Sequence, residues 1–246
     1  MYPHSNKTFG LNFLVAGGSV RLPARACGLF GMRVTTASLP LDGIVPSSSE
    51  FDTPGLLVRD AKLLQTAYRK WHTAKDYKSY PKRIILPTEF WPTVNETSMP
   101  VYETFISELS SFLGASVEHV NTNDSFIAHT GREEGLTQFT DALYSNITNW
   151  EGWYKVGLPF TQDYEAKFGY PPYVNPGARV RWERGMDLPE ESYRKALDHF
   201  AIYQEWFRSE IVPTCEEALV LYPWGPGFEA YRDVCYFYPA LSSYAI

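Results

Sequence analysis

The spacing of apolar residues predicts three well-defined helices. In residues 60–71, 102–114 and 189–212, apolar side chains recur every three or four positions, as they do on one face of a helix. The ends of these segments carry matching signals: Asp60 as an N-cap, Gly114 as a stop and Pro189 in a first turn. The third helix has the longest apolar stripe, formed by Tyr193, Leu197, Phe200, Phe207 and Ile211. The polar and aromatic segment 131–169 predicts two more helices, broken near Gly157 and Pro159.

Short uninterrupted apolar runs predict buried strands between these helices. They occur at 83–88 and 218–223, and a further run at 9–18 leads into a Gly-Gly-Ser turn; the segment SVEHVN at 116–121 is predicted as another strand. After that turn we expect a short helix that begins near Pro23 and a strand around residues 29–34. Strands that do not alternate apolar and polar residues are typical of sheets covered on both faces. The pattern therefore predicts the α/β class, a mixed β-sheet flanked by helices, in a single domain over residues 1–246.

Composition excludes several kinds of partner. The net charge is −6 and no run of basic residues occurs, so we expect neither nucleic acid nor a membrane as partner. An odd count of three cysteines, Cys27, Cys215 and Cys235, without a C-x-x-C spacing, favours a reducing, cytoplasmic location. The histidines lack the spacings of zinc sites, so we expect no metal and no cofactor.

The Gly17-Gly18-Ser19 turn is the candidate for chemistry. Glycines let a backbone turn aim several N–H groups at one point, which is the arrangement that stabilises an oxyanion beside a nucleophile. Arg21 stands where a lipase G-x-S-x-G elbow needs its second glycine, and no phosphate-loop motif follows the turn. An isolated Gly-Gly-Ser is more often a plain surface turn, so the assignment depends on its context.

That context resembles the amidase signature family. GGSVRLPARACGLFGMRVT, followed by GIVP and FDTPGLLVRDA, matches the family's nucleophile block and its downstream elements in register from Gly17 to Asp60. The later stretches KRIILPTEFWP, RWERG and YQEWFRSEIV look like a fungal branch, whose members often belong to secondary-metabolite pathways. The resemblance implies a Ser–cis-Ser–Lys hydrolase with Ser19 as the nucleophile and the backbone N–H groups of Ala16, Gly17 and Gly18 as the oxyanion hole. It implies a small amide or ester as substrate, whereas Arg21 and Asp52 are expected to be structural.

The resemblance is partial, and three hypotheses follow from that. The family's bridging serine and lysine lie upstream of the block, and Ser5 and Lys7 lack their glycine- and serine-rich setting, so neither role is transferred to them. We therefore expect an amidase domain that is incomplete at both ends and self-associates through apolar surface. One hypothesis is an amide hydrolase acting through Ser19, and a second is an inactive remnant that binds a ligand or partner. The third is a hydrolase with a new base, for which His119 and His129 are the mid-chain candidates.

Overall fold

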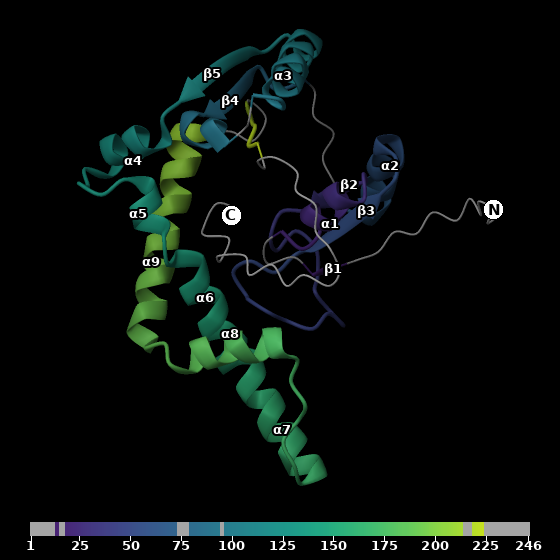
Figure 1. The fold of residues 1–246 in the computed structure, drawn as a ribbon, viewed down its shortest axis with the longest axis vertical. Helices are drawn as coiled ribbons and strands as arrows, with labels where there is room; N and C mark the ends of the chain where they lie inside the picture. The colour runs from purple at the N-terminus through teal and green to yellow at the C-terminus, as the bar shows by residue number, and fades with distance from the viewer. Residues whose placement is uncertain (1–12, 15–17, 73–78, 94–95, 214–217, 224–246) are drawn as a thin grey trace, which may run out of the picture. The chain divides into compact units, whose positions relative to one another are not determined.

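The fold is taken from a computed structural model, which describes residues 13–14, 18–72, 79–93, 96–213 and 218–223 (Figure 1). Contacts between residues divide the chain into two compact units. Unit 1 holds the described residues of 1–75 and of 144–196, and unit 2 holds those of 76–143 and of 197–243. The single domain over residues 1–246 that the sequence led us to expect stays a prediction.

Unit 1 contains an antiparallel sheet of three short strands in the order β1-β3-β2. Strand β3 (Pro54–Val58) is central and buried along its whole length. It pairs on one side with β1 (Phe13–Leu14) and on the other with β2 (Phe30–Arg33). Along the chain, α1 (Arg21–Ala26) lies between β1 and β2, and α2 (Ala61–Trp71) follows β3. Asp60 caps α2 as predicted, because its carboxylate accepts the N–H of Leu63 at 2.9 Å.

The rest of unit 1 is helical, and its central helix does not break where the sequence suggested. Helix α6 (Leu143–Glu151) continues through a π-helical turn (Gly152–Gly157) directly into α7 (Leu158–Phe168). The predicted break near Gly157 and Pro159 is therefore wrong. Pro159 lies in the first turn of α7, where the missing N–H and fixed φ of proline are tolerated, and a π turn absorbs the irregularity.

Helix α8 (Pro176–Met186) packs very closely on this continuous helix. A Cβ atom added at Gly185 would fall on the backbone carbonyl of Asn149, and one added at Gly157 would lie 2.7 Å from the Trp182 ring. Only glycine permits the approach at Gly185, because the opposing atom is backbone and cannot move aside. The last long helix, α9 (Glu190–Trp206), ends in a second π-helical turn (Phe207–Ile211), and its first residues belong to unit 1.

Unit 2 contains a parallel sheet in the order β5-β4-β6. Strand β4 (Arg83–Pro87) lies between β5 (Ser116–Val120) and β6 (Ala218–Val220), so all three predicted strands form. A 3₁₀ helix (Thr88–Thr93) follows β4, and α3 (Met99–Leu113) runs beside β4 and β5 (Figure 1). Gly114 ends α3 in the left-handed conformation, with φ of 59°, as its position in the sequence predicted.

Apolar side chains cover both faces of this parallel sheet. On one face Ile84 and Leu86 pack against Leu113 and Ala115. On the other, Ile85 packs with residues from α4 (Thr122–Thr130), α5 (Leu136–Thr140) and α9, namely Phe126, Phe139 and Trp206. Burial on both faces explains why the central strand β4 is a continuous apolar run in the sequence, whereas the edge strand β5 is largely exposed and carries polar residues. The α/β class with helices flanking a sheet is thus confirmed, with the strands divided between one antiparallel and one parallel sheet.

Candidate active site

Ser19 lies in an exposed turn at the start of α1. The N–H of Leu22 donates to the carbonyl of Gly18 at 2.8 Å and that of Ala24 to the carbonyl of Val20 at 3.1 Å, so the turn leads directly into the helix. Ser19 is exposed, whereas its neighbour Val20 is fully buried. The buried Val20 therefore fixes the backbone of the turn, while Ser19 is exposed to solvent. The short helix and following strand appear where they were predicted, at α1 and β2.

Close packing on β3 holds the turn in place. Val20 forms a small core with Ala24 and Leu57. A Cβ atom added at Gly55 would lie 2.8 Å from both the Val20 side chain and the carbonyl oxygen of Met32, so β3 accepts Val20 only because residue 55 is glycine. The position of Ser19 thus depends on the position of the start of β3.

The predicted oxyanion hole lies largely outside the described residues. Ala16 and Gly17 are not among them, and Gly18 is half-buried in the turn. The roles of Ser19 as nucleophile and of the Ala16, Gly17 and Gly18 N–H groups as oxyanion donors therefore stay predictions.

A lysine, two serines and a glutamate come together in unit 1 without having been predicted from the sequence. The Lys155 ammonium donates to Ser49 Oγ at 2.8 Å and to Glu151 Oε1 at 2.5 Å. The Ser48 hydroxyl donates to the other oxygen of Glu151. Glu151 and Lys155 are four residues apart on one helix, a spacing that brings opposite charges together and was the signal available in the sequence.

The charge state of Lys155 argues against a role as the missing base. A serine–lysine pair activates a nucleophile only when the amine is neutral. Partial burial lowers the pKa of Lys155, but the hydrogen bonds and charges of Glu151 and Tyr193 together outweigh burial, and the pKa is raised above its ordinary value. Lys155 therefore stays protonated at neutral pH and serves as a counterion to Glu151.

The two candidate histidine bases lie in unit 2. His129 is held between two carboxylates, with Nε2 at 2.7 Å from Glu205 and Nδ1 at 2.9 Å from Glu210. The hydrogen bonds to Glu205 and then Glu210 raise the pKa of His129, which favours the charged form, and an imidazole that already carries the proton cannot accept one from a serine. His119 is exposed on the edge strand β5. The structure therefore favours neither histidine as a replacement base.

Asp52 has the structural contacts expected of it. Its Oδ2 accepts the N–H groups of Ser47 at 2.7 Å and Ser48 at 2.9 Å, closing the loop before β3. Arg33 braces the same loop by donating to the carbonyl of Phe51 at 2.9 Å. Burial, and then the charge on Glu151, raise the pKa of Asp52 against the lowering effect of the two backbone N–H groups.

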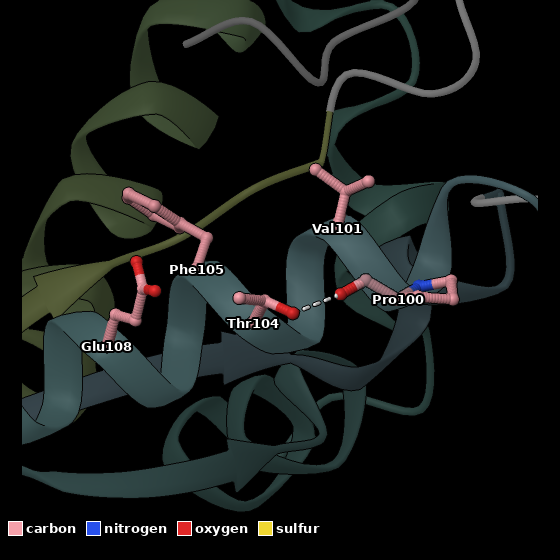
Figure 2. Close-up of a pocket in the computed structure, with 5 residues that line it drawn as sticks. All are labelled: Pro100, Val101, Thr104, Phe105 and Glu108. Atoms are coloured by element: carbon pink, nitrogen blue, oxygen red, sulfur yellow. Dashed lines mark hydrogen bonds between the residues drawn. The ribbon is translucent and has the colours of Figure 1, made fainter.

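Two surface hollows occur in unit 2. Five residues of α3 line the first, of about 470 Å³: Pro100, Val101, Thr104, Phe105 and Glu108 (Figure 2). Figure 2 shows Thr104 bonded to the Pro100 carbonyl within the same helix, at 2.8 Å, so its hydroxyl serves the helix. The second hollow, of about 580 Å³, lies among α3, β4 and β5 and includes Trp91, Tyr102 and His119.

Among the described residues no cluster of His, Cys, Asp and Glu could hold a metal, and no helix has the length and apolarity to span a membrane.

Comparison with known proteins finds a family match over the segment that contains Ser19. Residues 16–104 match the family model described as Amidase. The chain is 36% identical over 112 residues to an indoleacetamide hydrolase of Allorhizobium ampelinum, covering 42% of this chain and 24% of the relative. It is 32% identical over 160 residues to an indoleacetamide hydrolase of Pantoea agglomerans pv. gypsophilae, covering 63% of this chain and 33% of the relative. The chain thus spans a third or less of the length of these curated relatives.

Solved structures show the same fold. A crystal structure of an amidase superposes with a TM-score of 0.59 at 16% identity, covering 82% of this chain and 43% of that one. The structure of a 6-aminohexanoate cyclic dimer hydrolase in complex with its substrate gives the same TM-score at 14% identity, covering 81% of this chain and 44% of the other. The fold is that of part of these amidase structures, and the family match over residues 16–104 includes Ser19, β2 and β3.

Proposed function

We propose that the chain takes part in the hydrolysis of a small amide or ester, with Ser19 as the nucleophile. The observation that carries the proposal is the position of Ser19. It is exposed at the start of α1, next to a fully buried Val20, inside the segment that matches the Amidase family model. The names of the relatives support amide substrates, because two of them are indoleacetamide hydrolases. The resemblance to a fungal branch favours a step in secondary metabolism.

In this mechanism the Ser19 Oγ attacks the carbonyl carbon of the substrate while a base removes its proton. The negative charge that develops on the carbonyl oxygen is stabilised by the N–H groups of Ala16, Gly17 and Gly18. The C–N bond then breaks, the amine leaves with a proton, and water releases the acyl group from Ser19. The resemblance implies a lysine and a bridging serine as the base. Because Lys155 is held charged by Glu151, we assign the base to neither Lys155 nor Ser49.

The alternative is a chain that binds an amide without turning it over. The observation that favours it is the charged state of Lys155, which leaves Ser19 without an assigned base. The two alternatives differ in one measurable property, since a nucleophile with a base reacts with a serine-directed fluorophosphonate and an inactive serine does not.

The experiment compares wild type with Ser19→Ala for labelling by a fluorophosphonate and for hydrolysis of indoleacetamide. We expect wild type to be labelled and Ser19→Ala to lose both activities, with Ser79→Ala, an exposed serine of unit 2, as the matched control. Equal labelling of wild type and Ser19→Ala would contradict the assignment. Saturable amide binding without labelling or turnover would support the binding alternative. Adding a relative's upstream segment, fused or in trans, then tests whether that segment supplies the base.

A further inference from the structure

Glu151 is the most heavily hydrogen-bonded buried carboxylate described in unit 1. Its side chain is fully buried, and five donors converge on its two oxygens. Oε2 accepts the Ser48 hydroxyl at 2.5 Å and the Ser49 N–H at 2.8 Å. Oε1 accepts the Ser49 hydroxyl at 2.6 Å, the Lys155 ammonium at 2.5 Å and the Tyr193 hydroxyl at 2.9 Å. One carboxylate therefore joins the loop of Ser48 and Ser49 to two helices more than 40 residues away along the chain.

The charge on Glu151 is stable at neutral pH. Burial by itself raises the pKa of a carboxyl group, but here the hydrogen bonds from Lys155, Ser48, Ser49 and Tyr193 outweigh burial and lower it. A charged acceptor forms stronger hydrogen bonds than a neutral one, so ionised Glu151 is a firm anchor for the loop.

The anchored loop leads to the strand that holds the Ser19 turn. Ser48 contacts a carboxylate of α6 and one of its own loop, because its hydroxyl donates to Glu151 and its N–H donates to Asp52 at 2.9 Å. Asp52 and the fully buried Thr53 precede β3 directly. At the start of β3, Gly55 is the residue against which Val20 packs, and Val20 is bonded to Ser19. A short chain of contacts therefore runs from Glu151 to the turn.

We propose that Glu151 is a positioning residue for Ser19, acting through Ser48, Asp52 and the start of β3. This inference rests on the proposed function, because it concerns the reactivity of the same serine. Glutamine at position 151 keeps the size of the side chain but replaces one acceptor oxygen with an NH₂ group that faces donors. The loop then loses part of its anchor, and the Ser19 turn loses the fixed position of β3 beneath it.

The test separates misplacement from unfolding by kinetics. Reversible unfolding lowers the observed rate of labelling only in proportion to the folded fraction, which circular dichroism measures, whereas misplacement lowers the rate constant of the folded protein itself. We expect Glu151→Gln to lower this rate constant on the order of 10- to 100-fold, the effect of a displacement of about 1 Å, with the folded fraction unchanged. Glu190→Gln is the matched control, because it removes an exposed carboxylate that pairs with Arg194 on α9. It should label at the wild-type rate.

Each remaining outcome decides the matter. If Glu151→Gln is labelled at the wild-type rate while Ser19→Ala is not labelled, the positioning role is wrong and the proposed function stands. If wild type is not labelled at Ser19, the nucleophile assignment fails and the positioning role fails with it. If Glu151→Gln does not fold, Ser48→Ala decides instead, since it deletes one hydroxyl of the network. A slower rate in that variant supports the inference, and an unchanged rate overturns it.

Discussion

The two units have different kinds of interior. The interior of unit 2 is apolar and aromatic on both faces of a parallel sheet, with Ile85, Phe126 and Trp206 on one face. In unit 1 the apolar cluster of Val20, Ala24 and Leu57 is small, and a buried polar network around Glu151 connects the loop before β3 to the helices. Apolar packing does not depend on pH, whereas a network centred on a carboxylate does. Of the two interiors, we therefore expect that of the unit carrying Ser19 to be the one that responds to protonation.

The largest expected effect is the loss of the central aromatic residue of unit 2. Trp206 is 1% exposed, meets Phe126 edge-on at 5.5 Å and donates to Ser125 at 3.1 Å. Trp206→Ala should lower the free energy of unfolding by about 3–5 kcal/mol through cavity formation. Urea unfolding followed by circular dichroism measures it. Phe112→Ala, at a ring that is 70% exposed, is the control and should cost less than about 0.5 kcal/mol. Equal losses in the two variants would remove the contrast between core and surface.

The second effect is the loss of the buried charge of unit 1. Glu151→Gln should lower the free energy of unfolding at pH 7 by about 2–3 kcal/mol, less than for a fully buried pair because Lys155 is 45% exposed and regains water. The pKa of Glu151 is lowered in the folded state, so its contribution is present above the ordinary carboxyl pKa of 4.5 and is lost as pH falls through the folded value. Urea unfolding at pH 7 and pH 3 should therefore show the gap between wild type and variant closing in acid. A gap that does not change with pH would contradict the charge-based account.

The smallest effect, with the opposite sign in pH, is expected at Asp52. Its Oδ1 is buried and has no hydrogen-bond partner among the described residues, and burial raises its pKa. A raised pKa stabilises the fold below the ordinary value of 3.8, and that contribution is lost as pH rises through the folded value. Asp52→Asn should change the free energy of unfolding at pH 7 by less than about 1 kcal/mol, since an amide oxygen still accepts from Ser47 and Ser48. At pH 3 the free energy of unfolding of the same variant should fall further below that of wild type than it does at pH 7. A large loss at neutral pH would show that the Asp52 charge stabilises the loop after all.

Strands and helices were predicted correctly from the sequence where their local signals agree with the packing observed in the structure. The caps Asp60 and Gly114 and the apolar runs at β4 and β6 were predicted correctly, because caps and buried strands have sequence signals within a few residues. The face of α3 was less readable. Phe105, Leu109 and Phe112 lie on one apolar side, yet Leu109 packs against the core while Phe105 and Phe112 are 52% and 70% exposed. Periodicity identifies an apolar stripe, but only the neighbouring elements decide which part of it is buried.

The role of Ser19 as nucleophile stays a prediction, and only the turn that carries it has a local signal in the sequence. The Ser19 turn has a local motif, and the structure shows it exposed at the start of α1. The hydrogen bond between Ser48 and Glu151 joins residues 103 positions apart, and no pattern within one segment of the sequence predicts such a pair. The Glu151 and Lys155 spacing was visible, but it indicates a surface ion pair as readily as a buried anchor.

The contact between α8 and the continuous helix also has a genetic consequence. Every single-base change in a glycine codon that alters the amino acid adds a Cβ atom, and at position 185 that atom meets the Asn149 backbone. No amino-acid change at this codon avoids the clash, whether the new residue is alanine, serine or any larger one. In a library of random single-base variants selected for folded protein, codon 185 should therefore retain glycine, whereas codon 152, where an added Cβ meets only the Trp182 ring at 4.0 Å, should vary.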